Sequence, residues 1–201
     1  MKISDIKELY YIAHINNVKS ILQNGILCYN KAKKIMYTDI SDSKVQSRRE
    51  KEVIPGGKSK LHDYANLYFN ARNAMMSKRR DYHKDLCVLR INPDVLTFPK
   101  VILSDKNASS GYVRFYEITD IDKLDSSLIF TEDWRNGNTI QYWNKKSASC
   151  AEVLIPDCVG SKFIIGIYVS CQDTYEKLVG LLQGQPIANK IEIKPKLFFQ
   201  E

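Results

Sequence analysis

Long apolar runs are missing from this sequence, and their absence excludes membrane proteins built on spanning helices. No run approaches the about 18–20 apolar residues needed to cross a bilayer. Residues 1–8 carry too many charges to provide the apolar region of a signal peptide. We therefore expect a protein that is not inserted in a membrane and that works in the cytoplasm.

Residues for a metal centre or a disulfide framework are also scarce. The three histidines, His14, His62 and His83, are scattered and lack ligand spacing, so no metal site is predicted. The five cysteines form no C-x-x-C pair. Their number is odd, whereas secreted disulfide scaffolds favour even counts, so we expect reduced thiols in a cytoplasmic protein.

The length and the hydrophobic content are sufficient for one folded domain. The chain has 201 residues, of which 44% are hydrophobic. A chain of this size buries enough surface for a core of its own. We predict a single domain over residues 1–201 that acts as a monomer.

The positive charge is concentrated in one segment. The formal net charge is +7, and residues 44–80 carry ten Lys and Arg against three acidic residues, which accounts for the whole excess. A clustered basic face is typical of a protein that binds a polyanion such as nucleic acid. Charge alone also allows a solvated surface that only keeps the protein soluble.

The hydrophobic pattern predicts a mixture of strands and helices in one α+β domain. An asparagine, Asn16 or Asn17, is placed to cap a short helix that Gly25 ends, and a polar helix in residues 37–60 should run into an exposed loop at residues 55–57. Residues 172–182 read as an amphipathic helix, and residues 104–149 as a long polar segment with weak periodicity. Strands are predicted at residues 9–15, 62–69, 86–91, 101–103, 151–155, 164–170 and 191–199.

An arginine directly follows the predicted strand at residues 62–69. Leu67, Tyr68 and Phe69 lead into Arg72 and a methionine pair. An arginine has five fixed donors and keeps its charge, which suits bidentate contact with a phosphate. The alternative is an arginine that only solvates the turn at the end of the strand.

A carboxylate interrupts the later apolar strand at residues 151–155. Strand alternation places Cys150, Glu152 and Leu154 on one face. A carboxylate on an apolar strand needs a partner or a solvent-filled cleft. The alternative is an edge strand whose glutamate faces water.

Four segments, taken in order, resemble the DarT family, the toxin half of the DarTG toxin–antitoxin systems. Its members are NAD-dependent ADP-ribosyltransferases that act on bases of single-stranded DNA. The sequence departs from the family pattern at Asn16, where a threonine is common, and at Ala71 and Ala74, where prolines often flank the arginine. These departures leave thymine and guanine both open as the acceptor base. The resembling segments are residues 11–26, 61–75, 104–108 and 151–154.

The resemblance implies a fold, a reaction and a set of cofactor contacts. The fold would be an α+β, ADP-ribosyltransferase-like fold with a central split mixed β-sheet flanked by helices. Glu152 would be catalytic, because a carboxylate at the 2′-hydroxyl of the nicotinamide ribose stabilises the charge that develops at C1′. Arg72 would clamp a phosphate or the transition state, and NAD would be consumed without a metal. The implied NAD contacts are Ile12, His14, Asn17, Gly25, Tyr68, Asn70 and Arg72.

The partners implied by the resemblance are single-stranded DNA and a DarG-like macrodomain antitoxin. Aromatic side chains interleaved with cations suit single-stranded nucleic acid, because bases stack while phosphates meet Lys and Arg. The family chooses its substrate with the segment before the glutamate, here residues 136–149. Core packing is the alternative for both Trp134 and Trp143. The candidate DNA contacts are Arg48, Arg49, Tyr112, Arg114, Tyr116, Trp143, Lys145 and Lys146.

Two other functions remain open at the level of sequence. The same fold could modify RNA or protein instead of DNA. It could also be a catalytically silent module that binds nucleic acid, although such a module has no need of Glu152 and Arg72 together.

Overall fold

In the computed structural model of the 201-residue chain we describe residues 1–54, 59–135 and 137–201. The exposed loop predicted at residues 55–57, the basic residue Lys58 and the first residue of the predicted substrate segment, Asn136, lie outside the described residues.

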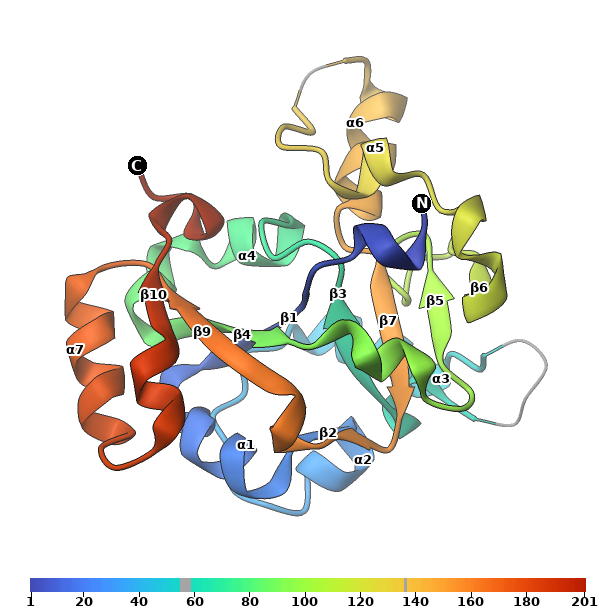
Figure 1. The fold of residues 1–201 in the computed structure, drawn as a ribbon. Coiled ribbons are helices and arrows are strands. Elements are labelled where there is room, and N and C mark those ends of the chain that lie inside the picture. The colour runs from blue at the N-terminus through green and yellow to red at the C-terminus, as the bar shows by residue number, and fades with distance from the viewer. Residues whose placement is uncertain (55–58, 136) are drawn as a thin grey trace.

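Strands and short helices alternate along the chain (Figure 1). The strands are β1 Leu9–His14, β2 Ile26–Leu27, β3 Tyr64–Tyr68, β4 Leu86–Ile91, β5 Ile102–Ser104, β6 Phe115–Glu117, β7 Glu152–Pro156, β8 Cys158–Val159, β9 Ile164–Val169 and β10 Ile191–Ile193. The α-helices are α1 Val18–Asn24, α2 Tyr29–Ala32, α3 Ser43–Lys51, α4 Ala74–Lys78, α5 Ser126–Ile129, α6 Thr139–Ala148 and α7 Gln172–Leu181. Single 3-10 turns fill several connections, among them Ile15–Asn17, Leu61–Asp63, Ser161–Phe163 and Pro195–Phe198.

The main sheet is mixed and is almost divided in two. Its strand order is β10-β9-β4-β1-β3-β7-β5-β6, and only the β10–β9 pair is parallel among the described residues. β1 and β3 meet at a single pair, Tyr10 with Tyr68. Beyond that pair, the C-terminal half of β1 diverges from the N-terminal half of β3, which leaves an opening in the sheet. The predicted split mixed sheet flanked by helices is confirmed.

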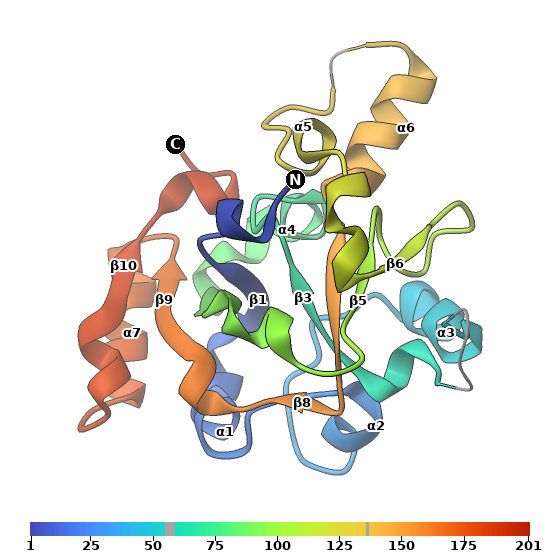
Figure 2. The same cartoon turned by 45° about the vertical axis from the view of Figure 1, so that its right-hand side comes forward.

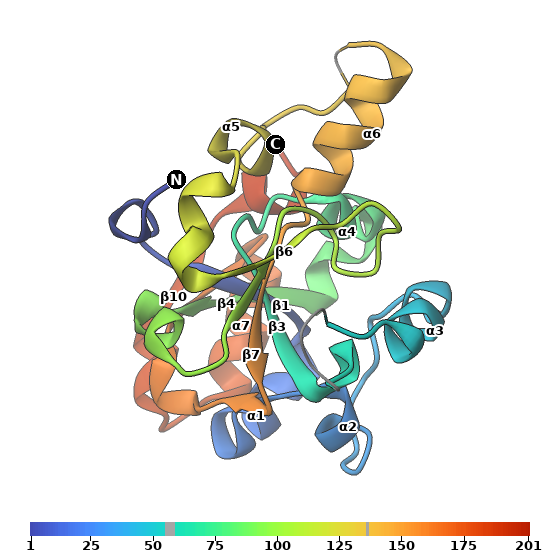
Figure 3. The same ribbon diagram turned by 90° about the vertical axis from the view of Figure 1, so that its right-hand side faces the viewer.

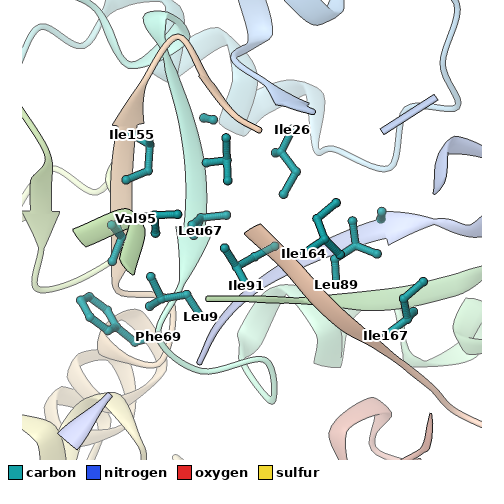
Figure 4. Packing of buried hydrophobic residues seen from close by; sticks show 14 of the residues in the cluster. Leu9, Ile26, Leu67, Phe69, Leu89, Ile91, Val95, Ile155, Ile164 and Ile167 are labelled. Carbon is teal, nitrogen blue, oxygen red and sulfur yellow. The ribbon is translucent and has the colours of Figure 1, made fainter. Parts of the chain in front are cut away.

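One face of the sheet carries the main hydrophobic core (Figure 4). Alternation points Leu67 of β3 and Val153 of β7 to this face, where they join Leu9 of β1, Leu89 of β4 and Phe69, the residue after β3. Helices α1 and α7 cover the core with Val18 and Leu178, both fully buried. The opposite face is left for Ile12, Tyr68 and Glu152.

The end of α1 requires a glycine, as predicted. Gly25 has a φ of 80°, a backbone conformation that residues other than glycine rarely adopt. A Cβ at this position would lie 2.5 Å from the carbonyl oxygen of Val159 in β8. The close approach lets β2 pair with β8 directly after the helix.

Two predicted elements differ from the structure. The long irregular segment at residues 104–149 contains β6, α5 and α6, and α6 begins with a capping box in which Asn138 and Gln141 bond each other's backbone N–H. The last predicted strand ends at Ile193 instead of residue 199. Pro195 lacks an N–H and starts a 3-10 turn, so pairing cannot continue.

The two tryptophans separate the alternatives that the sequence left open. Trp134 is buried, with its ring edge-on to Phe199, which confirms the core interpretation for this residue. Trp143 on α6 is 59% exposed. Across the part of the chain that is described, every helix is too short or too polar to cross a membrane.

Candidate active site

A cleft of about 300 Å³ opens where β1 and β3 diverge. Its floor comes from the sheet, through Ile12 of β1 and Asn66 and Tyr68 of β3. Its walls come from segment 37–42, from α3 and from the start of α4. Figure 2 shows β1 and β3 separating at this point, with α3 on the far side of β7.

Asn17 holds the wall formed by segment 37–42. Its side-chain amide donates to the carbonyl of Thr38 at 2.8 Å and accepts the N–H of Thr38, also at 2.8 Å. Asn17 itself lines the cleft. It therefore fixes the segment that closes one side of the site.

Glu152 lies beneath the cleft and is fully buried. Its strand is flanked by β3 and β5, so the interpretation as an edge strand facing water is wrong. Both carboxylate oxygens lie 3.0 Å from Nη1 of Arg49, and Oε1 also accepts the N–H of Ala108 at 3.0 Å. Its own N–H donates to Oγ of Ser104 at 3.0 Å. A desolvated charge is tolerated here because an opposite charge and a backbone donor compensate it.

Arg49 is the partner that the sequence interpretation placed elsewhere. It was assigned to DNA contact, but the structure buries its side chain to 7% exposure against Glu152. The chain packs α3 over the carboxylate with Arg49 facing inward, whereas the neighbouring Arg48 faces solvent. Nη2 of Arg49 is buried without a hydrogen-bond partner among the described residues, and Arg49 lines the cleft. An unsatisfied charged donor at a cleft wall is a group ready to bind a ligand oxygen.

The segment 104–108 forms the cradle of the carboxylate. Oγ of Ser104 accepts a hydrogen bond from the backbone N–H of Glu152, and the N–H of Ala108 donates to the Glu152 side chain. The sequence marked this segment as part of the resemblance but did not predict a contact with Glu152.

Tyr68 stands directly across from Glu152 in the β3–β7 ladder. Residues in register on neighbouring strands share a face, so the phenol and the carboxylate are neighbours. Burial, and then the charge of Glu152, raise the pKa of Tyr68 well above its usual value. The phenol therefore stays protonated, with its hydroxyl 3.4 Å from Sδ of Met75.

His62 was not singled out by sequence and supports the far wall of the cleft. Its Nε2 lies 3.0 Å from Oε1 of Gln46 on α3, and its ring stacks on Tyr29 with 4.1 Å between centroids. Burial lowers the pKa of His62, and the charge of Arg49 lowers it further. The ring is thus kept neutral, and it ties α3, and with it Arg49, to the 3-10 turn before β3.

His14 lies in an adjoining hollow of about 400 Å³, which shares residues 38–41, Lys78 and Arg79 with the cleft. Its Nδ1 accepts the N–H of Asn16 at 3.1 Å, so a neutral imidazole carries its proton on Nε2. The hollow places the imidazole of His14 beside Lys78 and Arg79, a set that suits a ribose and a phosphate.

The predicted NAD contacts divide into two groups. Ile12, Asn17 and Tyr68 line the cleft, and His14 lines the adjoining hollow. The other three predicted contacts are not among the described residues that line the cleft or the hollow. Gly25 ends α1 against β8, Asn70 bonds the carbonyl of Ile129, and Arg72 bonds the carbonyls of Glu132 and Lys196.

The candidate DNA contacts lie on three elements around Glu152: α3, the hairpin between β5 and β6, and α6. In Figure 3 all three elements project toward the right-hand side of the view. The hairpin is tied to α6 by the N–H of Asn107, which donates to the carbonyl of Ser147. Arg48, Tyr112, Arg114 and Trp143 are exposed; Tyr116, Lys145 and Lys146 are half-buried. Tyr116 packs partly against the core, and Lys146 donates to the hydroxyl of Tyr142 at 2.9 Å.

A metal has no evident place among the residues described, since no three His, Cys, Asp or Glu side chains gather there. The site contains charges of both signs instead: Arg49 is paired with Glu152, Lys78 is paired with Asp42, and Arg79, Asp39 and Asp85 also line the cleft or the hollow.

Comparison with known families and proteins finds one group throughout. Residues 10–199 match the model of the family described as "ssDNA thymidine ADP-ribosyltransferase, DarT". A "DNA ADP-ribosyl transferase-DNA ADP-ribosyl glycohydrolase fusion protein" of Thermosipho africanus is 30% identical over 90% of this chain and 47% of its own length. The chain thus spans about half the length of that relative.

Solved structures show the same likeness. The Thermosipho africanus DarTG in complex with ADP-ribose superposes with a TM-score of 0.84 and 28% identity, over 96% of this chain and 51% of that one. The Thermus sp. 2.9 DarT in complex with ADP-ribosylated ssDNA superposes with a TM-score of 0.83 and 20% identity, over 96% and 97% of the two chains. The second likeness concerns the fold alone.

Proposed function

Because the chain belongs to the DarT family, we propose that it is an NAD-dependent ADP-ribosyltransferase that modifies a base of single-stranded DNA and releases nicotinamide. The observation that carries this proposal is the pair of Glu152 and Arg49 at the opening of the sheet. A fully buried carboxylate with a charged, partly unsatisfied partner is costly to the fold, and such arrangements are concentrated at functional sites.

Glu152 acts on the nicotinamide ribose. Its carboxylate accepts a hydrogen bond from the 2′-hydroxyl and stabilises the positive charge that develops at C1′ as the bond to nicotinamide breaks. The bonding electrons return to the nicotinamide ring, which leaves neutral. A ring nitrogen of the base then bonds to C1′ and gives up its proton to Glu152 as the general base.

Arg49 holds the Glu152 carboxylate in place until the substrates arrive. Nη1 holds both carboxylate oxygens, and the free Nη2 is available to an oxygen of the bound substrate. A donor fixed beforehand costs no reorganisation at the moment of reaction.

NAD lies along the cleft and its adjoining hollow. Ile12, Asn17 and Tyr68 are proposed to contact the nicotinamide half, and His14 the adenosine ribose, with Lys78 and Arg79 near the pyrophosphate. For Gly25, Asn70 and Arg72, NAD contact stays a prediction.

The acceptor is proposed to be thymine, the base that the family description names. Single-stranded DNA fits the three surrounding elements, which combine exposed aromatics with cations. Guanine in DNA, RNA and protein are the other acceptors to test. A silent binding module is disfavoured, because binding alone has no use for the buried Glu152–Arg49 pair.

One experiment tests these assignments together. The protein is incubated with labelled NAD and, separately, with thymine-containing and thymine-free single strands, duplex DNA, RNA and protein. Label transferred to the thymine-containing single strand alone supports the proposal. Label on a thymine-free strand that is lost when guanine is also left out assigns guanine, whereas label only on RNA or protein contradicts the DNA assignment.

We further propose a DarG-like, macrodomain-type hydrolase as the partner that reverses the modification and so makes this enzyme the toxin of a pair. The fusion of transferase and glycohydrolase in the Thermosipho africanus relative supports this partner. Incubation of labelled DNA with such a hydrolase should release the label. A monomeric enzyme acting in the cytoplasm remains our proposal, and light scattering of the purified protein tests the monomer.

A further inference from the structure

The loop between β3 and α4 grips the segment that leads from α5 toward α6. Nδ2 of Asn70 donates to the carbonyl of Ile129 at 3.0 Å, and Nη1 of Arg72 donates to the carbonyl of Glu132 at 2.5 Å. The Asn70 side chain also accepts the N–H of Arg72 at 2.9 Å, which orients the two residues together. Two neighbouring side chains thus fix two carbonyls of one segment.

Arg72 joins that segment to residues 195–199. Its Nε donates to the carbonyl of Lys196 at 3.0 Å, and its guanidinium lies 4.1 Å from the centre of the Phe199 ring. The ring of Trp134 meets Phe199 edge-on, with 5.6 Å between centroids. Phe198 is fully buried against Ala71 and Met76, so segment 195–199 is anchored to the same loop. Arg72 is therefore the shared contact of three segments that are far apart in sequence.

These contacts set the position of α6. α5 ends at Ile129, and Leu128 of α5 shares a hollow with Gln141 and Asn144 of α6. At its other end, α6 leads through residues 149–151 into Glu152. Holding the end of α5 therefore holds α6 at a defined distance from the reacting carboxylate.

We infer that Arg72 and Asn70 are positioning residues for the acceptor: they fix α5 and α6 beside Glu152, and Phe199 and Trp134 complete the support. This inference rests on the proposed function, in which α6 carries acceptor contacts. Only arginine combines a donor for each of two carbonyls with a flat face for an aromatic ring. The assignment differs from a phosphate clamp because the guanidinium of Arg72 donates to two backbone carbonyls and lies against the Phe199 ring, so these contacts are all made with the protein itself.

Steady-state kinetics separate the two roles. We expect Arg72→Ala to raise KM for a single-stranded oligonucleotide about tenfold, the usual loss for charged hydrogen bonds, with little change in KM for NAD. Phe199→Ala should shift KM for DNA in the same direction, although Phe199 is not among the residues that line the cleft. The double variant should be no worse than the stronger single variant, because both act through one support. Arg72→Lys should recover little, since an ammonium cannot serve both carbonyls and the ring.

Lys162→Ala is the matched control. Lys162 also lies over an aromatic ring, that of Phe163 at 5.2 Å, but it belongs to the turn Ser161–Phe163, which follows β8. Its loss should leave both KM values unchanged. A rise in KM for NAD in Arg72→Ala, with Phe199→Ala like the wild type, would overturn the inference and favour the clamp.

Hydrogen exchange provides a readout that does not depend on transfer. Amides of residues 126–135 and 137–148 should exchange faster in Arg72→Ala and Phe199→Ala than in the wild type or Lys162→Ala. A wild-type protein that transfers no ADP-ribose would refute the proposed function alone, and the exchange rates would still decide the positioning role. Unchanged exchange rates in both variants would refute the positioning role of Arg72.

Discussion

Glu152 shows how the surroundings of one residue define its chemistry. The side chain is fully buried, yet three donor contacts surround it, two from Arg49 and one from Ala108. We predict that Glu152→Gln, which keeps the size and removes the charge, lowers kcat for ADP-ribose transfer on the order of 10²–10³-fold. The rate is measured with labelled NAD and a saturating single strand.

The control for this variant is Glu176→Gln, an exposed glutamate on α7. It should transfer at the wild-type rate. Near-wild-type turnover in Glu152→Gln would mean that another group stabilises the charge at C1′.

Arg48 and Arg49 offer a comparison between neighbours on one helix. Arg49→Ala leaves the buried carboxylate without its counter-charge, which costs about 3–5 kcal/mol in the free energy of unfolding. Arg48→Ala removes an exposed side chain and should change stability by less than about 0.5 kcal/mol. Urea denaturation of both variants measures this difference; equal losses would contradict the ion pair.

Sequence patterns predicted one member of the pair and not the other. Alternation in residues 150–155 put Glu152 on a definite face of a strand, because that information is local. Its partner is 103 residues away in sequence, and the helix pattern of α3 cannot tell which of two adjacent arginines turns inward. Tertiary packing decides that choice.

At the scale of elements, the sequence predicted most strands of the main sheet. It did not predict helix α6 or the end of the last strand. β1, β3, β4 and β9 fall within the predicted ranges, and β7 runs one residue past its range, to Pro156. Each of these strands is a short run of mostly apolar residues, which is a local signal. α6 was read as loop, although Asn138 and Gln141 carry the capping-box spacing; its exposed Ile140 and Trp143 blur the amphipathic pattern. Pro195 was the local signal that the last strand would stop early.

The attachment of α3 to the turn before β3 should depend on pH. His62 is held neutral with a lowered pKa, so in the pH range just below about 6.5 the unfolded chain binds its proton more readily than the folded chain does. The free energy of unfolding should therefore fall as the pH drops through this window.

His62→Phe keeps the stack on Tyr29 and removes the titrating group. We predict that its free energy of unfolding depends less steeply on pH than that of the wild type, when urea denaturation is compared at pH 7.5, 6.5 and 5.5. Parallel curves would show that His62 does not contribute to this dependence.

At the scale of the whole molecule, the sheet brings together groups that the sequence keeps apart. The single β1–β3 pair leaves a cleft between two halves of the sheet, and the charged groups of α3, α4 and β7 converge on it. Hydrophobic patterns predicted the strands but not this opening, which depends on strand pairing over long distances. The family resemblance supplied it instead.

The same arrangement predicts that single-stranded DNA binds in a basic groove with an affinity that falls as the salt concentration rises. Arg48, Lys145 and Lys146 lie on the two helices that flank Glu152, and each phosphate neutralised on a single strand contributes a slope of about −0.7 to log K against log salt. Replacing all three by alanine should reduce the slope by up to about 2 and leave NAD affinity unchanged. Fluorescence anisotropy of a labelled oligonucleotide at several salt concentrations measures the slope.

A control with the same change in net charge separates a groove from a general attraction. Lys162, Lys177 and Lys190 are exposed and lie on elements after β8, away from α3 and α6. Their replacement by alanine should leave the slope nearly unchanged if the phosphates follow the proposed groove. Duplex DNA should be a poor substrate for either protein, because extruding a paired base costs a few kcal/mol before it can reach Glu152. Equal slopes in the two triple variants, or equal transfer to duplex and single strand, would show that the acceptor does not bind along α3 and α6.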